Sequence, residues 1–192
     1  MRICVYTGSR HGSRPEYEAA ARNFGTLLAS EGIGLVYGGG HLGLMGVIAD
    51  AALAAGGEVV GVIPQKLVEW EVAHTGLTEL HVVHSMHERK QMMADLADAF
   101  VALPGGIGTM EELFEVWAWL HLGYHDKPCA LLDVAGFYAP LVAFLDRMVD
   151  EGFLKRGTRE MLLTDTDSRA LLEQLRAFRA PATLPILDRD EL

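Results

Sequence analysis

Cysteine is scarce in this chain, and long uncharged apolar runs are absent. The two cysteines, Cys4 and Cys129, lie in apolar, strand-like stretches. We therefore expect reduced core residues and not a disulfide framework. No uncharged apolar stretch is long enough to cross a bilayer, and no basic-then-apolar leader opens the sequence. These absences predict a cytoplasmic protein that has no membrane partner.

Basic charge is also low, because 16 Lys and Arg stand against 26 Asp and Glu, a net charge of −10. Surfaces for nucleic acid or anionic lipid need a basic field, so we expect no nucleic-acid polymer as partner. A small anionic ligand is still compatible with this charge, because a few backbone N–H groups can hold it locally. The composition is otherwise that of an ordinary globular protein.

The order of apolar and amphipathic segments predicts the fold class. At roughly 150 residues per domain, we expect one domain over residues 1–180 and an irregular tail over 181–192. Short, continuously apolar runs, typical of strands covered on both faces, alternate with helix-length stretches. The expected strands are Ile3–Tyr6, Ile33–Tyr37, Val59–Ile63, Leu80–Val83, Phe100–Leu103 and Pro128–Leu132, and the expected helices are Pro15–Ser30, Leu44–Ala55, Met86–Ala97, Met110–Leu122, Phe137–Glu151 and Ser168–Arg179. This is an α/β pattern of a doubly wound, mostly parallel sheet with helices on both faces.

Three loops that follow expected strands are rich in glycine. They are Thr7–Gly12, Gly38–Gly43 and Pro104–Thr109, and each leads into an expected helix. Ligands bind beyond the carboxyl ends of parallel strands, where helix starts offer unpaired N–H groups to a phosphate. Glycines also make tight strand–helix turns, which is the alternative reading for any one loop. Together the loops predict phosphate or nucleotide binding, with contacts at Gly8, Ser9, Gly38, Gly39, Gly40 and Gly105.

Other nucleotide signatures are weak or missing. Gly38, Gly40 and Gly43 fit the dinucleotide pattern G-x-G-x-x-G, but the next strand ends in Pro64, and the nearest acid, Glu58, precedes that strand. A dinucleotide site wants an acidic residue at that strand end to hold the ribose. No glycine is followed by Lys-Ser or Lys-Thr, so a Walker-type loop is absent.

Two charged residues fall where apolar residues are expected. Arg89 lies on the apolar stripe of its helix, between Met86 and Met93. A guanidinium facing inward needs a carboxylate or phosphate partner, although its stem can also pack while its head reaches solvent. Glu112 lies beside an inner stripe and directly after the Pro104–Thr109 loop. The helix dipole favours a carboxylate there, but at the rim of an anion site it also suggests a cation partner or catalysis.

Histidine does not form a convincing metal motif. His81, His84 and His87 are spaced across a strand end and a helix start, so they are not expected to converge. The pair His121 and His125 lacks the glutamate of H-E-x-x-H. No Ser-His-Asp or Cys-His pairing and no G-x-S-x-G elbow stand out. We therefore expect no metal site.

Two segments taken together resemble the paired signatures of the LOG ("lonely guy") family, cytokinin-activating phosphoribohydrolases that are often labelled lysine decarboxylases. The segments are Met86–Lys90 and Pro104–Glu112, and the likeness extends from about Ile3 to Leu154. It implies a Rossmann-like homodimer that needs no cofactor. The implied reaction hydrolyses the N-glycosidic bond of AMP or N6-prenylated AMP, releasing the free base and ribose 5-phosphate.

The resemblance also assigns residues. The family's catalytic arginine falls on Arg89 and its catalytic glutamate on Glu112. Its nucleotide contacts fall on Glu71, Lys90 and the segment that contains Gly106, Ile107, Gly108, Thr109, Met110 and Glu111. Ala118 replaces a threonine found in many members, which affects the expected preference for prenylated adenine.

Two other functions compete with this hypothesis. One is a non-catalytic carrier of a nucleotide or of molybdenum cofactor, since related folds bind that cofactor through similar loops. The other is an NAD-binding oxidoreductase, for which the acidic ribose partner is missing. The homodimer has separate support in the helix with Phe114, Trp117, Trp119 and Leu120, which is apolar on several sides. Such a helix is either central to the core or packed against a second subunit.

Overall fold

The structure is a computed structural model that describes residues 1–69 and 72–181. Two expectations fall outside this range: the substrate contact at Glu71, and the irregular tail, of which only Pro181 is described. One sheet runs through the molecule in the order β4-β3-β2-β1-β5-β6-β7, and every pair of neighbouring strands is parallel. The strands are β1 (Arg2–Tyr6), β2 (Gly34–Tyr37), β3 (Val59–Pro64), β4 (Glu79–Val83), β5 (Ala99–Ala102), β6 (Cys129–Leu132) and β7 (Leu162–Asp165).

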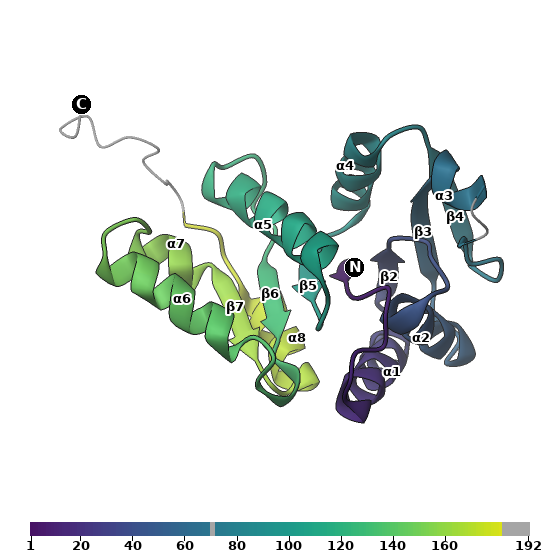
Figure 1. The fold of residues 1–192 in the computed structure, drawn as a ribbon, viewed down its shortest axis with the longest axis horizontal. Coiled ribbons are helices and arrows are strands. Elements are labelled where there is room, and N and C mark those ends of the chain that lie inside the picture. Colours follow the sequence, from purple (N-terminus) through teal and green to yellow (C-terminus); the bar gives the residue numbers. More distant parts are fainter. Residues whose placement is uncertain (70–71, 182–192) are drawn as a thin grey trace.

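Helices cover both faces of this sheet (Figure 1). They are α1 (Pro15–Ser30), α2 (Gly43–Ala54), α3 (Gln65–Glu69), α4 (Met86–Leu96), α5 (Ile107–His121), α6 (Ala139–Asp150), α7 (Arg156–Glu160) and α8 (Ser168–Ala177), with a 3-10 turn η1 at Val134–Gly136. One apolar core lies between the sheet and α1, α2 and α8, and a second lies between the sheet and α4, α5 and α6. The predicted Rossmann-like α/β fold with helices on both faces is thereby confirmed.

The inner strands are buried along nearly their whole length, as their continuous apolar runs predict, and in β1 Arg2 alone is half-buried. All residues of β2, β5 and β6 are buried, because helices pack on both faces of these strands. Cys4 and Cys129 are fully buried free thiols, in agreement with their expected place in the core. Across the described ranges, the helices are too short or too polar to traverse a bilayer.

Several features differ from the sequence-based expectations. The sheet gains an edge strand, β7, whose four residues are too few to stand out from the flanking segments. The sequence pattern does not predict the short helices α3 and α7, and α5 begins at Ile107 instead of Met110. The mostly parallel sheet that was expected is parallel at every pair of neighbouring strands, and an isolated antiparallel bridge joins Gly40 and Ala73. Helix α6 begins at Ala139 and not at Phe137, because η1 holds Ala135 at a φ of 54° just before it.

The direction of chain progression reverses at β1, which pairs with β2 on one side and β5 on the other. The loops that follow β1 and β5 therefore diverge from adjacent strands and leave a crevice between them. They remain joined at their base, since the N–H of Gly8 donates to the carbonyl of Pro104 at 3.1 Å. This edge of the sheet is where the predicted site residues gather.

Candidate active site

A cavity of about 620 Å³ opens at this reversal point. Its walls come from the loops after β1 and β5 and from the starts of α2 and α5. Helices α1, α3 and α4 each add one side chain, and Phe137 adds another directly after η1. The lining residues include Gly8, Ser9, Arg10, His11, Tyr17, Met45, Leu67, Arg89, Gly105, Gly106, Ile107, Gly108, Thr109, Glu112 and Phe137. A pocket of a few hundred Å³ at such a switch point is the usual place for a small ligand in this architecture.

Glycines hold the loop walls in close contact. Gly43, the first residue of α2, has a φ of +59°, and a Cβ there would overlap the backbone of Ser9 and Arg10. A Cβ on Gly105 would overlap the side chain of Thr109. The N–H of Met45 donates to the carbonyl of Gly8 at 3.3 Å. These contacts fix the loops around the cavity independently of any ligand.

Helix α5 presents its N-terminus to the cavity. Gly106 is its N-cap in an extended conformation, and no side chain caps this end. The first-turn N–H groups of Ile107, Gly108 and Thr109 have no intrahelical acceptor, and the helix dipole adds a partial positive charge. The same end therefore suits a bound anion such as phosphate.

Arg89 enters the cavity wall from the first turn and a half of α4. Ser85 caps this helix by accepting from the N–H of Glu88, while the carboxylate of Glu88 accepts from the N–H of His84 at 2.8 Å. The side chain of Arg89 is only 10% exposed. Its Nε donates to the carbonyl of Val62 at 3.1 Å. The inward orientation is thus the correct one of the two alternatives left open by the sequence.

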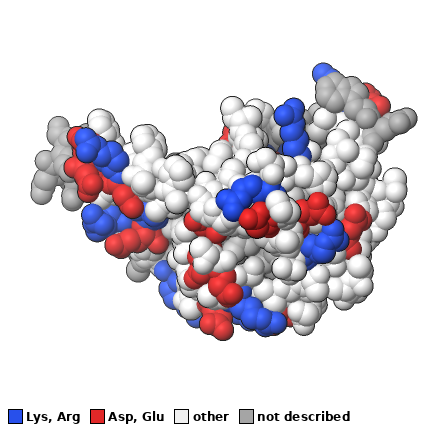
Figure 2. Space-filling model, turned by 60° about the horizontal axis from the view of Figure 1, so that its bottom comes forward, with Lys and Arg blue, Asp and Glu red and all other residues white. Residues whose placement is uncertain are grey.

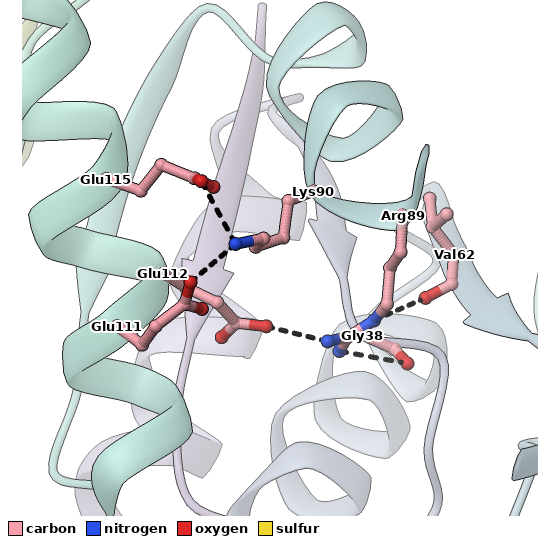
Figure 3. A network of polar contacts seen from close by, with 7 residues as sticks. All are labelled: Gly38, Val62, Arg89, Lys90, Glu111, Glu112 and Glu115. Atoms are coloured by element: carbon pink, nitrogen blue, oxygen red, sulfur yellow. Dashed lines mark hydrogen bonds and ion pairs between the residues drawn. The ribbon is translucent and has the colours of Figure 1, made fainter. Parts of the chain in front are cut away.

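The other end of the Arg89 guanidinium meets Glu112 on α5 (Figure 3). Nη1 donates to Oε1 of Glu112 at 2.7 Å, and Nη2 lies 3.5 Å from the carbonyl oxygen of Gly38. Glu112 is 11% exposed at its side chain. Burial raises the pKa of Glu112, and the positive charge of Arg89 opposes this rise. The site therefore holds a desolvated carboxylate whose raised pKa is limited by the charge of its arginine partner.

Lys90 forms a second ionic cluster beside this pair. Its Nζ contacts the carboxylates of Glu111 and Glu115, the latter at 3.0 Å, and its side chain is 10% exposed. Burial alone would lower the pKa of Lys90, but the hydrogen bonds that its ammonium donates to these carboxylates outweigh burial and raise the pKa. The second carboxylate oxygen of Glu115 is buried without a partner among the described residues. Lys90 thus ties α4 to α5 at a point next to Arg89 and Glu112 (Figure 3).

The structure brings many of the sequence-predicted residues to the cavity. Arg89 and Glu112 meet there, and the lining also includes Gly8, Ser9 and the run from Gly105 to Thr109. Gly38 lies just behind Arg89. Gly39, Gly40, Lys90, Met110 and Glu111 are not among the lining residues, and their contacts with a substrate stay predictions.

Sequence reasoning missed other side chains of the wall. Arg10, His11, Tyr17, Leu67 and Phe137 all line the cavity. Arg10 and His11 lie inside one of the glycine-rich loops, so a charge count within that loop would have found them. Tyr17 and Phe137 come from separate elements and meet edge-on with ring centroids 5.7 Å apart. No local pattern marks such a tertiary contact.

The histidine and acidic positions weighed in the sequence have ordinary structural partners. His121 pairs with the hydroxyl of Thr158, and His125 with the carbonyl of Val116. Within residues 1–69 and 72–181, no three His, Cys, Asp or Glu side chains are grouped as a metal site needs. Glu58 binds Arg2 at 2.7 Å, at the strand end opposite the glycine loops. It therefore cannot supply the ribose contact of an NAD site.

Charge is mixed over the surface as well. On the face shown in Figure 2, basic and acidic side chains are interspersed among uncharged ones. No continuous basic field covers the described part of that face. This arrangement agrees with the acidic composition of the chain.

Comparisons with known proteins show which family the chain resembles. A family model described as "Possible lysine decarboxylase" matches residues 45–175. A cytokinin riboside 5'-monophosphate phosphoribohydrolase of Rhodococcoides fascians is 47% identical over 91% of this chain and 89% of its own length. The cytokinin riboside 5'-monophosphate phosphoribohydrolase LOG of Oryza sativa subsp. japonica is 47% identical over 92% of this chain and 73% of its own length.

Among solved structures, the molybdenum cofactor carrier protein of Chlamydomonas reinhardtii has a TM-score of 0.70, at 23% identity over 92% of this chain and 98% of that chain. This likeness shows the shared fold. The sequence identities to the phosphoribohydrolases are much higher and cover nearly the whole described range. On that basis, this chain belongs to the LOG family.

Proposed function

We propose that this protein is a phosphoribohydrolase that cleaves the N-glycosidic bond of adenosine-type nucleoside 5'-monophosphates. Its substrates are AMP and N6-prenylated AMP, and its products are the free base and ribose 5-phosphate. The observation that carries the proposal is the Arg89–Glu112 pair, joined at 2.7 Å in the wall of a cavity bounded by the N-terminus of α5. The named activities of relatives that are 47% identical point the same way.

The reaction needs a negative group near the ribose. As the C1'–N bond breaks, its electron pair moves to the base, and positive charge develops on C1' and the ring oxygen. Glu112 can stabilise this charge and accept a proton from the water that adds to C1', and the same proton, passed on to the departing base, gives the neutral free base. Burial strengthens both effects, because a carboxylate in a water-poor site interacts strongly with a nearby positive charge.

Arg89 holds Glu112 in place for this role. Its guanidinium is fixed by the carbonyls of Val62 and Gly38, so the hydrogen bond to Glu112 has one defined direction. An arginine keeps its charge when buried, and here it limits the rise in the pKa of Glu112. The charge of Arg89 thereby favours the ionised form of the carboxylate. Its remaining N–H capacity faces the cavity and can bind the substrate.

The residues do not fit the chemistry named in the family description. Pyridoxal phosphate, the usual cofactor for amino-acid decarboxylation, binds through a Schiff base with a lysine. Among the described residues that line the cavity there is no lysine. Lys90 lies nearby, but Glu111 and Glu115 hold its Nζ. The cavity therefore does not fit pyridoxal phosphate.

A carrier function is not favoured by any specific contact. The solved carrier protein is 23% identical, a likeness that supports the fold alone. A carrier has no need for a buried carboxylate at the ligand, whereas a glycosidase does. The Arg89–Glu112 pair therefore favours the enzyme.

We also propose that the protein acts as a cytoplasmic homodimer. The apolar helix α5 has two kinds of face. Trp117 and Leu120 are buried in the core, while Phe114 and Trp119 stay partly exposed next to Leu122, which is 40% exposed. Partly exposed apolar side chains on a helix that borders the surface favour contact with a second subunit. Reduced, buried cysteines support the compartment.

A panel of purified reactions tests the function. AMP, isopentenyl-adenosine monophosphate and the matching nucleosides are incubated with the protein, and the released base is measured by chromatography. The proposal expects release from the monophosphates and little from the nucleosides. If none of the monophosphates yields free base under varied conditions, the proposal is wrong.

A further inference from the structure

The cavity wall includes a positively charged side chain that takes no part in the Arg89–Glu112 pair. Arg10 lines the cavity on the loop after β1, and its side chain is exposed. Within the described parts of the chain, it has no carboxylate and no hydrogen-bond partner. The other lining arginine, Arg89, is already neutralised by Glu112. Arg10 therefore supplies the net positive charge of the cavity wall.

Close contacts fix the backbone of Arg10 in the wall of the cavity. Gly43 packs so closely against the Ser9–Arg10 peptide that any side chain at residue 43 would overlap it. One residue earlier, the N–H and carbonyl of Gly8 are bonded to Pro104 and Met45. This anchoring makes the loop a fixed base, from which the long Arg10 side chain projects. The guanidinium is therefore carried by a backbone that is fixed in the cavity wall.

The same rim contains the start of α5. The Thr7–Gly12 loop and the Pro104–Thr109 loop are in contact, since a Cβ on Gly8 would lie 3.4 Å from the Cα of Gly105. Arg10 and the free N–H groups of the first turn of α5 thus border one opening. Backbone N–H groups orient an anion but carry no net charge, whereas a phosphate monoester carries about −1.5 to −2 at pH 7. A cation beside these N–H groups completes the site electrostatically.

We propose that Arg10 is the residue that binds the 5'-phosphate by charge and makes the enzyme prefer nucleotides over nucleosides. This inference rests on the proposed function. Arg10 pairs with the phosphate oxygens, while the N–H groups of α5 set the orientation of the phosphate. Arg89 and Glu112 act on the ribose. The assignment separates phosphate recognition from bond cleavage, and each is carried by a different arginine.

The proposal predicts a selective kinetic defect. Charge-assisted hydrogen bonds contribute about 1.5–3 kcal/mol, which corresponds to roughly a 10- to 100-fold change in binding. We expect Arg10→Gln to lower kcat/KM for AMP by about that factor, mainly through KM, because the phosphate is bound equally in the ground and transition states. Adenosine has no phosphate, so the preference for AMP over adenosine, given by the ratio of their kcat/KM values, should fall with Arg10→Gln. Arg10→Lys should recover part of the loss, since it restores charge without the planar fork.

A matched control is Arg147→Gln. Arg147 lies on α6, forms an exposed ion pair with Glu151, and is not among the residues that line the cavity.

A binding measurement separates this inference from the function. Calorimetry with ribose 5-phosphate and with ribose reads phosphate recognition without turnover. If the wild type cleaves AMP and Arg10→Gln cleaves it equally well, Arg10 has no such role, although the function stands. If the wild type cleaves none of the nucleotides but binds ribose 5-phosphate, and Arg10→Gln loses that binding, the role of Arg10 stands and the function fails.

Discussion

Nη1 of Arg89 and Oε1 of Glu112 lie 2.7 Å apart, although the residues belong to different helices and are 23 positions apart in the sequence. Both side chains are nearly buried, so the pair is held in a low-dielectric wall and not at the surface. Removing one partner from such a pair leaves a buried charge without compensation, which costs about 3–5 kcal/mol. A pair that is costly to bury and lies in a cavity wall is a candidate for a role in chemistry, which is the role proposed for it above.

Replacing Glu112 by glutamine tests the catalytic role directly. Glutamine keeps the volume and can still accept a hydrogen bond from Arg89, but it can neither take a proton nor offset a positive charge. We expect kcat for AMP to fall by about 10²–10⁴-fold, with KM changed little. Steady-state kinetics measure the effect, and circular dichroism checks the fold. A variant that retains more than a third of wild-type kcat would show that Glu112 is not the catalytic carboxylate.

The pH dependence follows from the raised pKa of Glu112. The reaction needs the ionised carboxylate, so kcat/KM should fall as the pH drops through this pKa. Because the pKa is raised, the acid limb should lie at higher pH than for an ordinary glutamate. The profile of kcat/KM between pH 4 and 8 measures it. A limb at or below the usual glutamate range would contradict this assignment.

Neighbouring charges should move that limb in opposite directions. The charge of Lys90 lowers the pKa of Glu112, and the charge of Glu111 raises it. Lys90→Met should therefore move the acid limb to higher pH, and Glu111→Gln should move it to lower pH. A direct contact of either residue with substrate would change KM without this pattern. Shifts of the same sign in both variants would exclude an electrostatic origin.

The fold was predictable because its signal is local. Continuous apolar runs mark the inner strands, and glycine-rich loops mark their carboxyl ends. The sequence therefore predicts which edge of the sheet holds the candidate site. The short edge strand β7 escaped prediction, because its outer edge is unpaired and three of its four residues are only half-buried. Periodicity worked for the helices that cover the sheet.

The site was predictable only in part, because its key contacts join distant segments. In α4, periodicity selects Met86, Met93 and Leu96 as the inner stripe, yet Met86 is 46% exposed. Arg89 and Lys90 are buried instead, each held by carboxylates of α5. Helical spacing identifies a face but not the polar partners that make a charged residue stable there. The family resemblance named Arg89 and Glu112, and the structure supplies the reason that they are paired.

Steric exclusion at Gly38 offers an independent test of the Arg89 geometry. A Cβ at this position would overlap Nη2 of Arg89, and Gly38 does not have the positive φ that would itself disfavour alanine. Gly38→Ala should therefore displace the guanidinium and lower kcat/KM by at least tenfold, with roughly 1–3 kcal/mol of lost stability from overpacking. Gly157→Ala is the matched control, because nothing lies within 4 Å of its added Cβ. Equal activity of the two variants would mean that the precise position of Arg89 is unimportant.

The exposed face of α5 makes the homodimer testable. Trp119 is partly exposed on this face and borders a surface pocket of about 420 Å³ with Tyr124 and Lys127. Large aromatic residues in an interface commonly contribute 2 kcal/mol or more to association. We expect light scattering with size exclusion to give a dimer at micromolar concentration, and Trp119→Glu to weaken it at least tenfold, since a charge would be desolvated on association. Phe144→Glu on α6 is the matched control, because Phe144 is 61% exposed and lies on a different helix. A monomeric wild type rejects the dimer, and equal weakening by both variants places the interface elsewhere than α5.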